Sequence, residues 1–281
     1  MAVNKVVYNR DGIEETLIDL TSDTVTADKL AKGYTAHTQA GELITGTMES
    51  GGSGGEDFAS FISGTLTDWV VPNVETIRPY CCYGLNSDLD WLQSITLPEG
   101  LKTIGDYAFG GCRKITSINL PSTLQSIGKG AFRDWSKLLS ITIPSNVTQI
   151  LSSTFSSCAS LTSVEFLGNV TTIGDYAFYM CSSLSSITLP EGLTTIGREA
   201  FEECNLQTIT IPASVTTLGY YCFQYNRKLT TVTFKGTPTK IYSAFYTDTA
   251  ITDIYVPWAE GAVSGAPWGA TNATVHYNTT T

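Results

Sequence analysis

The sequence predicts a mostly β solenoid of about eight turns of about 22–23 residues each, preceded by a small β-rich module. Two observations carry this prediction: a phenylalanine recurs at a constant interval, and apolar and polar residues alternate along one segment of every repeat. The phenylalanines follow one another at 23 residues as far as Phe201 and at 22 residues for the last two steps. They are Phe109, Phe132, Phe155, Phe178, Phe201, Phe223 and Phe245. A period of this length is the signature of a stacked repeat architecture.

The alternating segment is predicted to form a short strand. In one repeat the apolar positions are Leu138, Ile141 and Ile143, a polar residue stands between the last two, and Pro144 follows. An apolar–polar alternation with period two indicates a strand with one buried face. Proline ends the strand because it has no N–H group for the ladder.

A second recurring segment reads Ile-Gly-x-x-Ala-Phe, as at residues 104–109. We expect the glycine to permit a tight bend, the small alanine to let the convex-side backbone pack closely, and the phenylalanine to fill the interior. One repeat cannot bury its own apolar face, so stacking must make the core continuous. Strands about 4.8 Å apart over about eight turns predict a rod of roughly 40 Å.

These columns resemble the BspA-like leucine-rich-repeat family, whose pattern is L-x-x-I-x-(L/I)-P-x-x-(L/V)-x-x-I-G-x-x-A-F-x-x-C. The resemblance extends over residues 58–256 and departs locally: Trp135 replaces the cysteine, Leu151 replaces the glycine, and Asn205 marks a one-residue deletion. Members occur on bacterial surfaces, as secreted proteins, in some protists and in phages. The resemblance implies a leucine-rich-repeat solenoid that recognises a partner, usually in adhesion, without catalysis.

Both ends of the solenoid are expected to be closed. Before the regular turns, Ile77 takes the aliphatic position and Cys82 the phenylalanine position, with an insertion at 86–90 and a capping half-turn over 58–71. After them, residues 257–281 are predicted to form a C-terminal cap built on Trp258 and Trp268, with an edge strand over 273–277. A ligand platform made by the two tryptophans is the alternative; the cap is favoured because an open solenoid end must be covered.

The chain is predicted to comprise a module at 1–49, a Gly/Ser linker at 50–56, the solenoid at 57–256 and the cap at 257–281. In the module we expect strands over 3–9 and 15–20, a helix over 26–33, and a hairpin over 34–48 that turns at 40–41. Such a small module has a thin core, so it is expected to oligomerise, as a homotrimer, or to dock on a partner. Its anchoring residues are expected to be Val6, Tyr8, Leu17, Leu20, Leu30, Tyr34 and Leu43.

Residues 1–49 resemble the beginning of tail and minor structural proteins from phages of Gram-positive gut bacteria. This resemblance implies that the module contacts other virion proteins. The N-terminal stretch MAVNKVVYNRDGIEE also lacks the apolar core of a signal peptide. The sequence therefore favours a non-enzymatic phage virion protein of the tail, baseplate or head fibre, which displays the solenoid for host-surface recognition. The alternative is a BspA-like bacterial cell-surface or secreted adhesin, and an intracellular scaffold is a third interpretation.

The net charge and the cysteine count limit the kinds of partner and compartment that the sequence predicts. A net charge of −10 argues against nucleic acid and against anionic membranes, and no apolar run reaches the ~20 residues of a membrane helix. Seven cysteines, an odd number, argue against a closed disulfide framework and favour free thiols in a reducing compartment. Four of them form a column, Cys112, Cys158, Cys181 and Cys204. The column could be cross-linked or bind a metal, but packing is the favoured interpretation.

No catalytic residue, cofactor or metal is predicted, because the two histidines, His37 and His276, lie in separate modules and no phosphate loop, nucleophile elbow or zinc pattern is present. A ligand, either a glycan or a protein, is expected on the outward strand positions of the concave face. These are Ser94, Thr96, Ser117, Asn119, Ser140, Thr142, Ser163, Glu165, Ser186, Thr188, Thr208, Thr210, Thr231 and Thr233, continued by Asp253 and Tyr255. The alternative is that they serve only solubility and strand propensity. Aromatic residues are expected on the convex loops, with Tyr179 and Tyr225 the most exposed.

Overall fold

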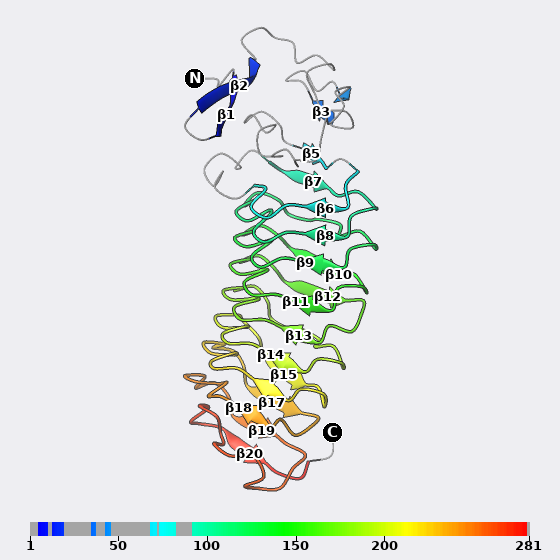
Figure 1. Cartoon of the computed structure of the whole chain (residues 1–281). Coiled ribbons are helices and arrows are strands. Elements are labelled where there is room, and N and C mark those ends of the chain that lie inside the picture. The colour runs from blue at the N-terminus through cyan, green and yellow to red at the C-terminus, as the bar shows by residue number, and fades with distance from the viewer. Residues whose placement is uncertain are drawn as a thin grey trace.

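A computed structural model describes residues 68–71, 73–82 and 92–279, together with the backbone of four short strands between residues 5 and 45. The repeat region is a parallel β solenoid of eight turns, and the described residues contain no helix (Figure 1). The predicted leucine-rich-repeat solenoid and its turn length are therefore confirmed.

The alternating segments form the longer strands, as predicted. These are β7 (Ser94–Thr96), β10 (Ser140–Ile143), β12 (Ser163–Phe166), β15 (Thr208–Ile211), β17 (Thr231–Phe234) and β19 (Asp253–Tyr255), with β5 (Asp68–Val70) and β20 (Thr274–His276) at the two ends. They pair in parallel and in register, so that Ile141 lies beside Val164 and Ile209 beside Val232. The register keeps each apolar residue on the buried side of the sheet.

Two turns carry the alternation without a strand. Residues 117–120 and 186–189 have no strand assignment, although Ser117 and Asn119 are exposed and Ile118 is buried. The long-strand sheet is therefore divided into β5-β7, β10-β12 and β15-β17-β19-β20. Alternation reports which side chains face the core, whereas a strand also needs ladder hydrogen bonds, so the prediction of a strand in every turn was wrong for these two.

A second sheet of two-residue strands was not predicted. It consists of β6 (Thr76–Ile77), β8 (Thr103–Ile104), β9 (Ser126–Ile127), β11 (Gln149–Ile150), β13 (Thr172–Ile173), β14 (Thr195–Ile196), β16 (Thr217–Leu218) and β18 (Lys240–Ile241). They pair in parallel as β6-β8-β9 and β11-β13-β14-β16-β18. Two residues are too few to display a period, which is why sequence patterning did not find them.

The glycine that follows these short strands allows close stacking of turns rather than a bend. None of the glycines at this position has a positive φ. A Cβ on Gly197 would instead lie 2.5 Å from the backbone nitrogen of Asp175, and one on Gly219 would lie 2.6 Å from that of Arg198. The predicted role in bending was therefore wrong: in these turns the glycine leaves room for the backbone of the preceding turn, whereas Leu151 takes the position in one turn.

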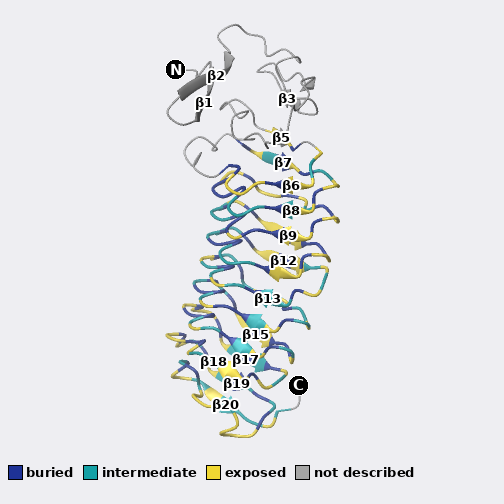
Figure 2. Cartoon of the chain, viewed as in Figure 1, coloured by how far each residue is buried: buried dark blue, intermediate teal, exposed yellow. Residues whose placement is uncertain are grey.

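The phenylalanines form a continuous stack in the core (Figure 2 shows the buried interior in dark blue). Each of the seven is fully buried, and neighbouring ring centroids are 5.3–5.9 Å apart with interplanar angles of 3–20°. These are distances at which aromatic pairs attract each other beyond simple burial. Cys82 occupies the equivalent position in the first turn and is also fully buried, as predicted.

Left-handed residues lie two positions before and two after each phenylalanine, and also two positions before Cys82, which takes the phenylalanine position in the first turn. They are Tyr80, Tyr107, Gly130, Ser153, Tyr176, Glu199, Tyr221 and Ser243 on one side, and Gly111, Asp134, Ser157, Met180, Glu203, Tyr225 and Thr247 on the other. Glycine is the residue that adopts this conformation without strain, yet it fills only two of the positions. The loops are thus held in this geometry by inter-turn hydrogen bonds, such as the one from Tyr176 N to Arg198 O at 2.8 Å.

The cysteine column donates hydrogen bonds between turns. The thiols of Cys158, Cys181 and Cys204 contact the backbone oxygens of the phenylalanines 26 residues earlier, at 3.4, 3.3 and 3.2 Å. The seven cysteines are buried free thiols, and burial raises the pKa of Cys158 far above its ordinary value, which keeps the donor protonated. The packing interpretation is confirmed, and a hydrogen-bonding role is added to it.

Where another residue replaces cysteine at Trp135 and Asn226, its side chain still donates a hydrogen bond to a phenylalanine carbonyl of the preceding turn. Trp135 donates from Nε1 to Phe109 O at 2.6 Å, and Asn226 donates from Nδ2 to Phe201 O at 2.8 Å. The apparent departure at Trp135 therefore preserves the hydrogen bond that the thiols make elsewhere.

The C-terminal end of the solenoid is covered by two buried tryptophans. The ring centroids of Trp258 and Trp268 lie 5.3 and 5.8 Å from that of Phe234, and 6.1 Å from each other. The predicted edge strand is present as β20, which pairs in parallel with β19. The tryptophans thus pack over the last turn as the cap interpretation requires.

In the N-terminal module the two predicted hairpins are present. Strand β1 (Lys5–Arg10) pairs antiparallel with β2 (Ile13–Asp19), and β3 (Thr35–His37) pairs antiparallel with β4 (Leu43–Thr45). The predicted helix over 26–33, the linker, and the side chains of the seven anchoring residues lie outside what the structure describes, as does the insertion at 86–90.

Candidate functional site

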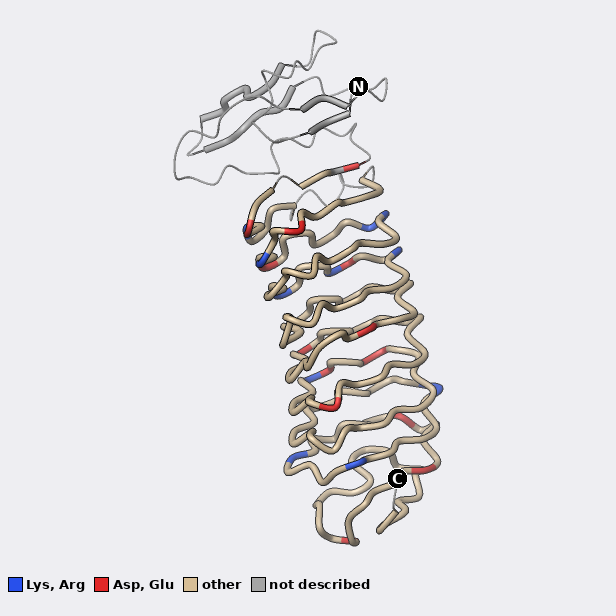
Figure 3. Tube along the Cα trace, turned by 90° about the vertical axis from the view of Figure 1, so that its right-hand side faces the viewer, with Lys and Arg blue, Asp and Glu red and all other residues tan. Residues whose placement is uncertain are grey.

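The long-strand face consists of the predicted outward residues, from Ser94 and Thr96 to Thr231 and Thr233. Most are exposed, and the half-buried members include Ser94, Thr231 and Thr233. Glu165 is the one charged residue among them; its Oε2 accepts a hydrogen bond from Thr142 Oγ1 at 3.2 Å. Charged residues are also sparse along the rest of the described solenoid (Figure 3). The face therefore offers a regular array of short hydroxyl groups.

An aromatic pair ends this face. The rings of Tyr255 and His276 stack with centroids 4.6 Å apart and an interplanar angle of 12°. His276 Nε2 lies 2.7 Å from Asp253 Oδ1, a hydrogen bond that lowers the pKa of the aspartate below its ordinary value. Sequence analysis did not bring His276 to this face, because the histidine belongs to the cap and reaches β19 only through the pairing of β20.

The tyrosine surface, formed by Tyr220, Tyr221, Tyr242 and Tyr246, covers the loop edge of two adjacent turns. Ring centroids are 4.7 Å apart for Tyr220 and Tyr242, 5.5 Å for Tyr221 and Tyr246, and 5.9 Å for Tyr220 and Tyr221. Tyr220 and Tyr246 are 50% and 49% exposed. Tyrosines combine apolar area with a polar hydroxyl and are enriched at interfaces.

The exposure of the predicted aromatic residues is mixed. Tyr225 is exposed as expected, but Tyr179 is half-buried. Its ring lies 5.9 Å from that of Tyr176, over which the Arg198 guanidinium sits at 5.9 Å. Burial, followed by the charge of Glu203, raises the pKa of Tyr179 above its ordinary value. Tyr179 thus belongs partly to the packing between turns, and expectation from loop position alone overstated its exposure.

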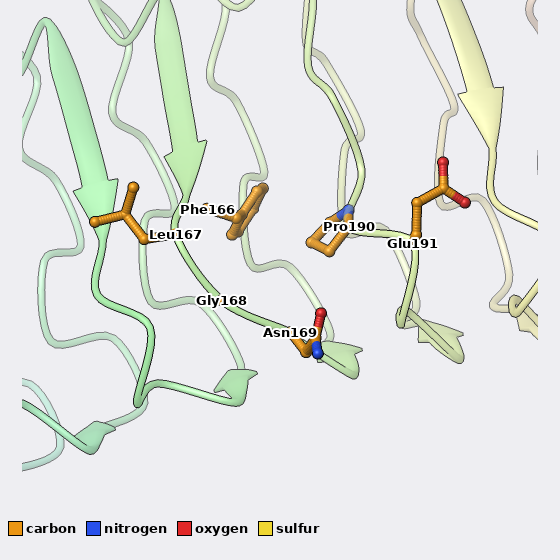
Figure 4. A pocket seen from close by; sticks show the side chains of 6 residues that line it. All are labelled: Phe166, Leu167, Gly168, Asn169, Pro190 and Glu191. Carbon is orange, nitrogen blue, oxygen red and sulfur yellow. The ribbon is translucent and has the colours of Figure 1, made fainter.

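A pocket opens where one turn lacks the proline after its strand (Figure 4). It is lined by Phe166, Leu167, Gly168, Asn169, Pro190 and Glu191. A Cβ on Gly168 would lie 2.6 Å from Ser145 Cα, so this turn runs close to its predecessor. Phe166 is left half-buried and Leu167 is 58% exposed.

The pattern Phe-x-Gly recurs at Phe234-Lys235-Gly236, where the cap fills the corresponding space. Trp258 packs against Phe234 there, and Phe234 is fully buried. Lys235 also reaches back across two turns to Glu191 at 2.7 Å. The Phe166 pocket is therefore the uncovered counterpart of a site that the protein covers with its own tryptophan.

The described residues hold no group of three or more His, Cys, Asp or Glu side chains arranged to bind a metal ion. Nor do they include a helix of the length and hydropathy needed to cross a membrane.

A stacked parallel solenoid with an aromatic ladder and a hydroxyl-rich strand face defines a leucine-rich-repeat protein. Residues 58–174 and 150–260 match the BspA type leucine rich repeat region, in six copies. The chain belongs to this family.

Solved structures were found with a similar fold. A leucine-rich repeat protein from Bacteroides ovatus is 21% identical, with a TM-score of 0.57 over 99% of this chain and 76% of that one. A leucine rich cell surface protein from Faecalibacterium prausnitzii is 22% identical, with a TM-score of 0.43 over 77% of this chain and 61% of that one. The search of curated proteins finds no match.

Proposed function

We propose that this chain is a non-catalytic recognition protein of the bacterial cell-surface or secreted adhesin type. Its family membership supports a binding scaffold, and the observation that carries the proposal is the tyrosine surface. Tyr220 and Tyr246, which are 50% and 49% exposed, both pack on Tyr221 and so gather exposed aromatic area on one part of the solenoid. Clustered aromatic residues contribute most of the binding energy at many interfaces, and a rigid frame lowers the entropy lost on binding.

The long-strand face would add hydrogen-bonding capacity to the same function. Its hydroxyl groups can donate to and accept from a glycan or a peptide backbone. Each such contact is weak in water, so affinity would come from the tyrosine surface or from the Phe166 pocket. The ligand class is thus a host-surface glycan or protein.

Binding of the full chain to arrays of immobilised glycans and purified extracellular-matrix proteins tests the proposal. We expect the double variant Tyr220→Ser/Tyr246→Ser to weaken binding at least tenfold. Tyr80→Ser is the matched control, since Tyr80 is 55% exposed at the other end of the solenoid, and it should bind normally. Loss of binding in the control but not in the double variant would overturn the assignment of the surface.

Cell fractionation tests the location. An adhesin should be detected on intact cells or in the medium by an antibody to residues 92–279. Detection only inside lysed cells would exclude the adhesin interpretation.

A phage virion role is the second candidate, and the resemblance of residues 1–49 to phage tail proteins favours it. In that case the module would bind other virion proteins as a homotrimer, and trimeric display would convert weak contacts into avidity. Mass spectrometry of purified particles should then find the chain. Sedimentation of the full chain, compared with a chain that lacks residues 1–49, tests the trimer: a monomer in both cases would contradict it.

A further inference from the structure

Asp248 occupies the hydrogen-bond donor column in the last regular turn. It stands three residues after Phe245, as Cys181 stands after Phe178 and Asn226 after Phe223. Its backbone N–H bonds to Phe245 O at 3.1 Å, as that of Cys181 bonds to Phe178 O at 3.2 Å. Alignment with the preceding turns assigns Asp248 to the position whose occupants donate to the carbonyl of the phenylalanine one turn earlier. For Asp248 that carbonyl belongs to Phe223, which also accepts a hydrogen bond from Asn226 Nδ2 at 2.7 Å.

A carboxylate cannot make that bond, because it has no hydrogen to donate. Asp248 is 1% exposed, and neither side-chain oxygen has a well-formed hydrogen bond among the described residues. An ionised carboxyl in this position would lose its hydration, and the backbone N–H groups of Asn226 and Tyr225 would offset only part of that loss. A protonated carboxyl can act as a donor like the other residues of the column, because its O–H can donate to the Phe223 oxygen.

We propose that Asp248 is a proton-operated clasp: its protonated carboxyl donates to the Phe223 carbonyl and ties the last turn to its predecessor, and loss of the proton to solvent releases the C-terminal end of the solenoid. This inference concerns the response of the protein to pH and stands apart from the ligand that the solenoid binds.

The surroundings favour the protonated form. Burial raises the pKa of Asp248 to about 8; the negative charge of Glu202 adds to the shift, and the backbone N–H groups of Asn226 and Tyr225 oppose it without cancelling it. Glu202 is itself buried with Oε2 unpartnered among the described residues, and burial, with a hydrogen bond to Glu199, raises its pKa to about 8. The nearby Cys222 thiol, whose pKa burial raises, is neutral. Among these groups none supplies a full positive charge that would hold Asp248 ionised.

Hydrogen–deuterium exchange of the full chain at pH 7 and pH 9.5, corrected for the intrinsic rate of each pH, tests the clasp. We expect peptides from residues 243–279 to exchange at least tenfold faster at pH 9.5, while peptides from 92–180 are unchanged. Asp248→Asn, which donates at both pH values as Asn226 does, should remove the response. Asp253→Asn is the matched control, because it removes the same charge from an accessible aspartate, and it should respond like the wild type.

Three results would overturn the proposal: no pH response in the wild type, a response that persists in Asp248→Asn, or a response removed only by Glu202→Gln. If Asp248→Asn fails to fold, infrared spectroscopy of the wild type with labelled aspartate decides. A carbonyl stretch of a buried protonated carboxyl group at pH 7 that disappears by pH 9.5 supports the clasp, and its absence at pH 7 refutes it.

Discussion

Replacing Phe178 tests whether the phenylalanine ladder stabilises the solenoid by ring stacking as well as by burial. Its ring is fully buried and stacks on Phe155 at 5.5 Å and on Phe201 at 5.3 Å. Truncation of a buried phenylalanine to alanine costs about 3–5 kcal/mol. Each aromatic pair contributes about 0.5–1.5 kcal/mol beyond burial, so about 1–3 kcal/mol of the loss belongs to the two stacks.

Two variants separate these contributions. Phe178→Ala should lower the free energy of unfolding by about 4 kcal/mol. Phe178→Leu keeps most of the buried area and loses the stacking, so it should cost about 1–3 kcal/mol. Urea unfolding followed by circular dichroism and tryptophan fluorescence measures both. Equal losses in the two variants, or a loss below about 1 kcal/mol for alanine, would refute the reasoning.

Further predictions concern the backbone and the buried carboxyl. Gly197→Ala should destabilise by about 1–3 kcal/mol through its overlap with the preceding turn, whereas Gly192→Ala, whose added Cβ would meet its nearest neighbour at 3.6 Å, should be tolerated; equal melting temperatures would contradict this. Thr247→Asn should raise the melting temperature, because a β-branched residue in the left-handed region is strained and asparagine adopts that region readily; an unchanged or lower value would show that the strain is absent. Asp248→Asn should stabilise increasingly between pH 4 and pH 8, by at most about 1.4 kcal/mol per pH unit. The sign follows because the folded protein holds the Asp248 proton more tightly than the unfolded chain, so wild-type stability falls as pH rises toward the folded pKa of about 8; urea titrations that give a pH-independent difference would contradict it.

The repeating part of the fold could be predicted because its determinants are local. The interval between Phe178 and Phe201, the alternation in β12, and the cysteine column each recur often enough to be recognised. What the sequence concealed was the contact between turns. Glycine is needed at position 197 because the backbone of Asp175 in the preceding turn lies too close for a Cβ atom, and only the stacked structure shows this distance.

The candidate site was predicted less completely for the same reason. The outward positions of the strands follow from alternation, and most of them are exposed as expected. The pairing of Tyr255 with His276 depends on how the cap folds back, and the Phe166 pocket depends on a turn that leans toward Ser145. The left-handed loop positions gave no signal either, because tyrosine, serine and glutamate fill most of the places where glycine would have marked them.

The spacing of the hydrogen bonds bears on how the protein acquires its structure. Side-chain bonds between adjacent turns join residues that are close in the sequence, as in the contacts of Cys158 with Phe132 and of Asn226 with Leu206. A typical separation of about 23 residues in a chain of 281 gives a relative contact order of about 0.08, within the range of helical bundles and below that of β sandwiches. Proteins made of strands usually fold slowly because their contacts join distant residues. Here each new turn closes a loop of about 23 residues when it packs on the turn before it. Assembly can therefore begin at any well-packed pair of turns and advance in both directions along the solenoid.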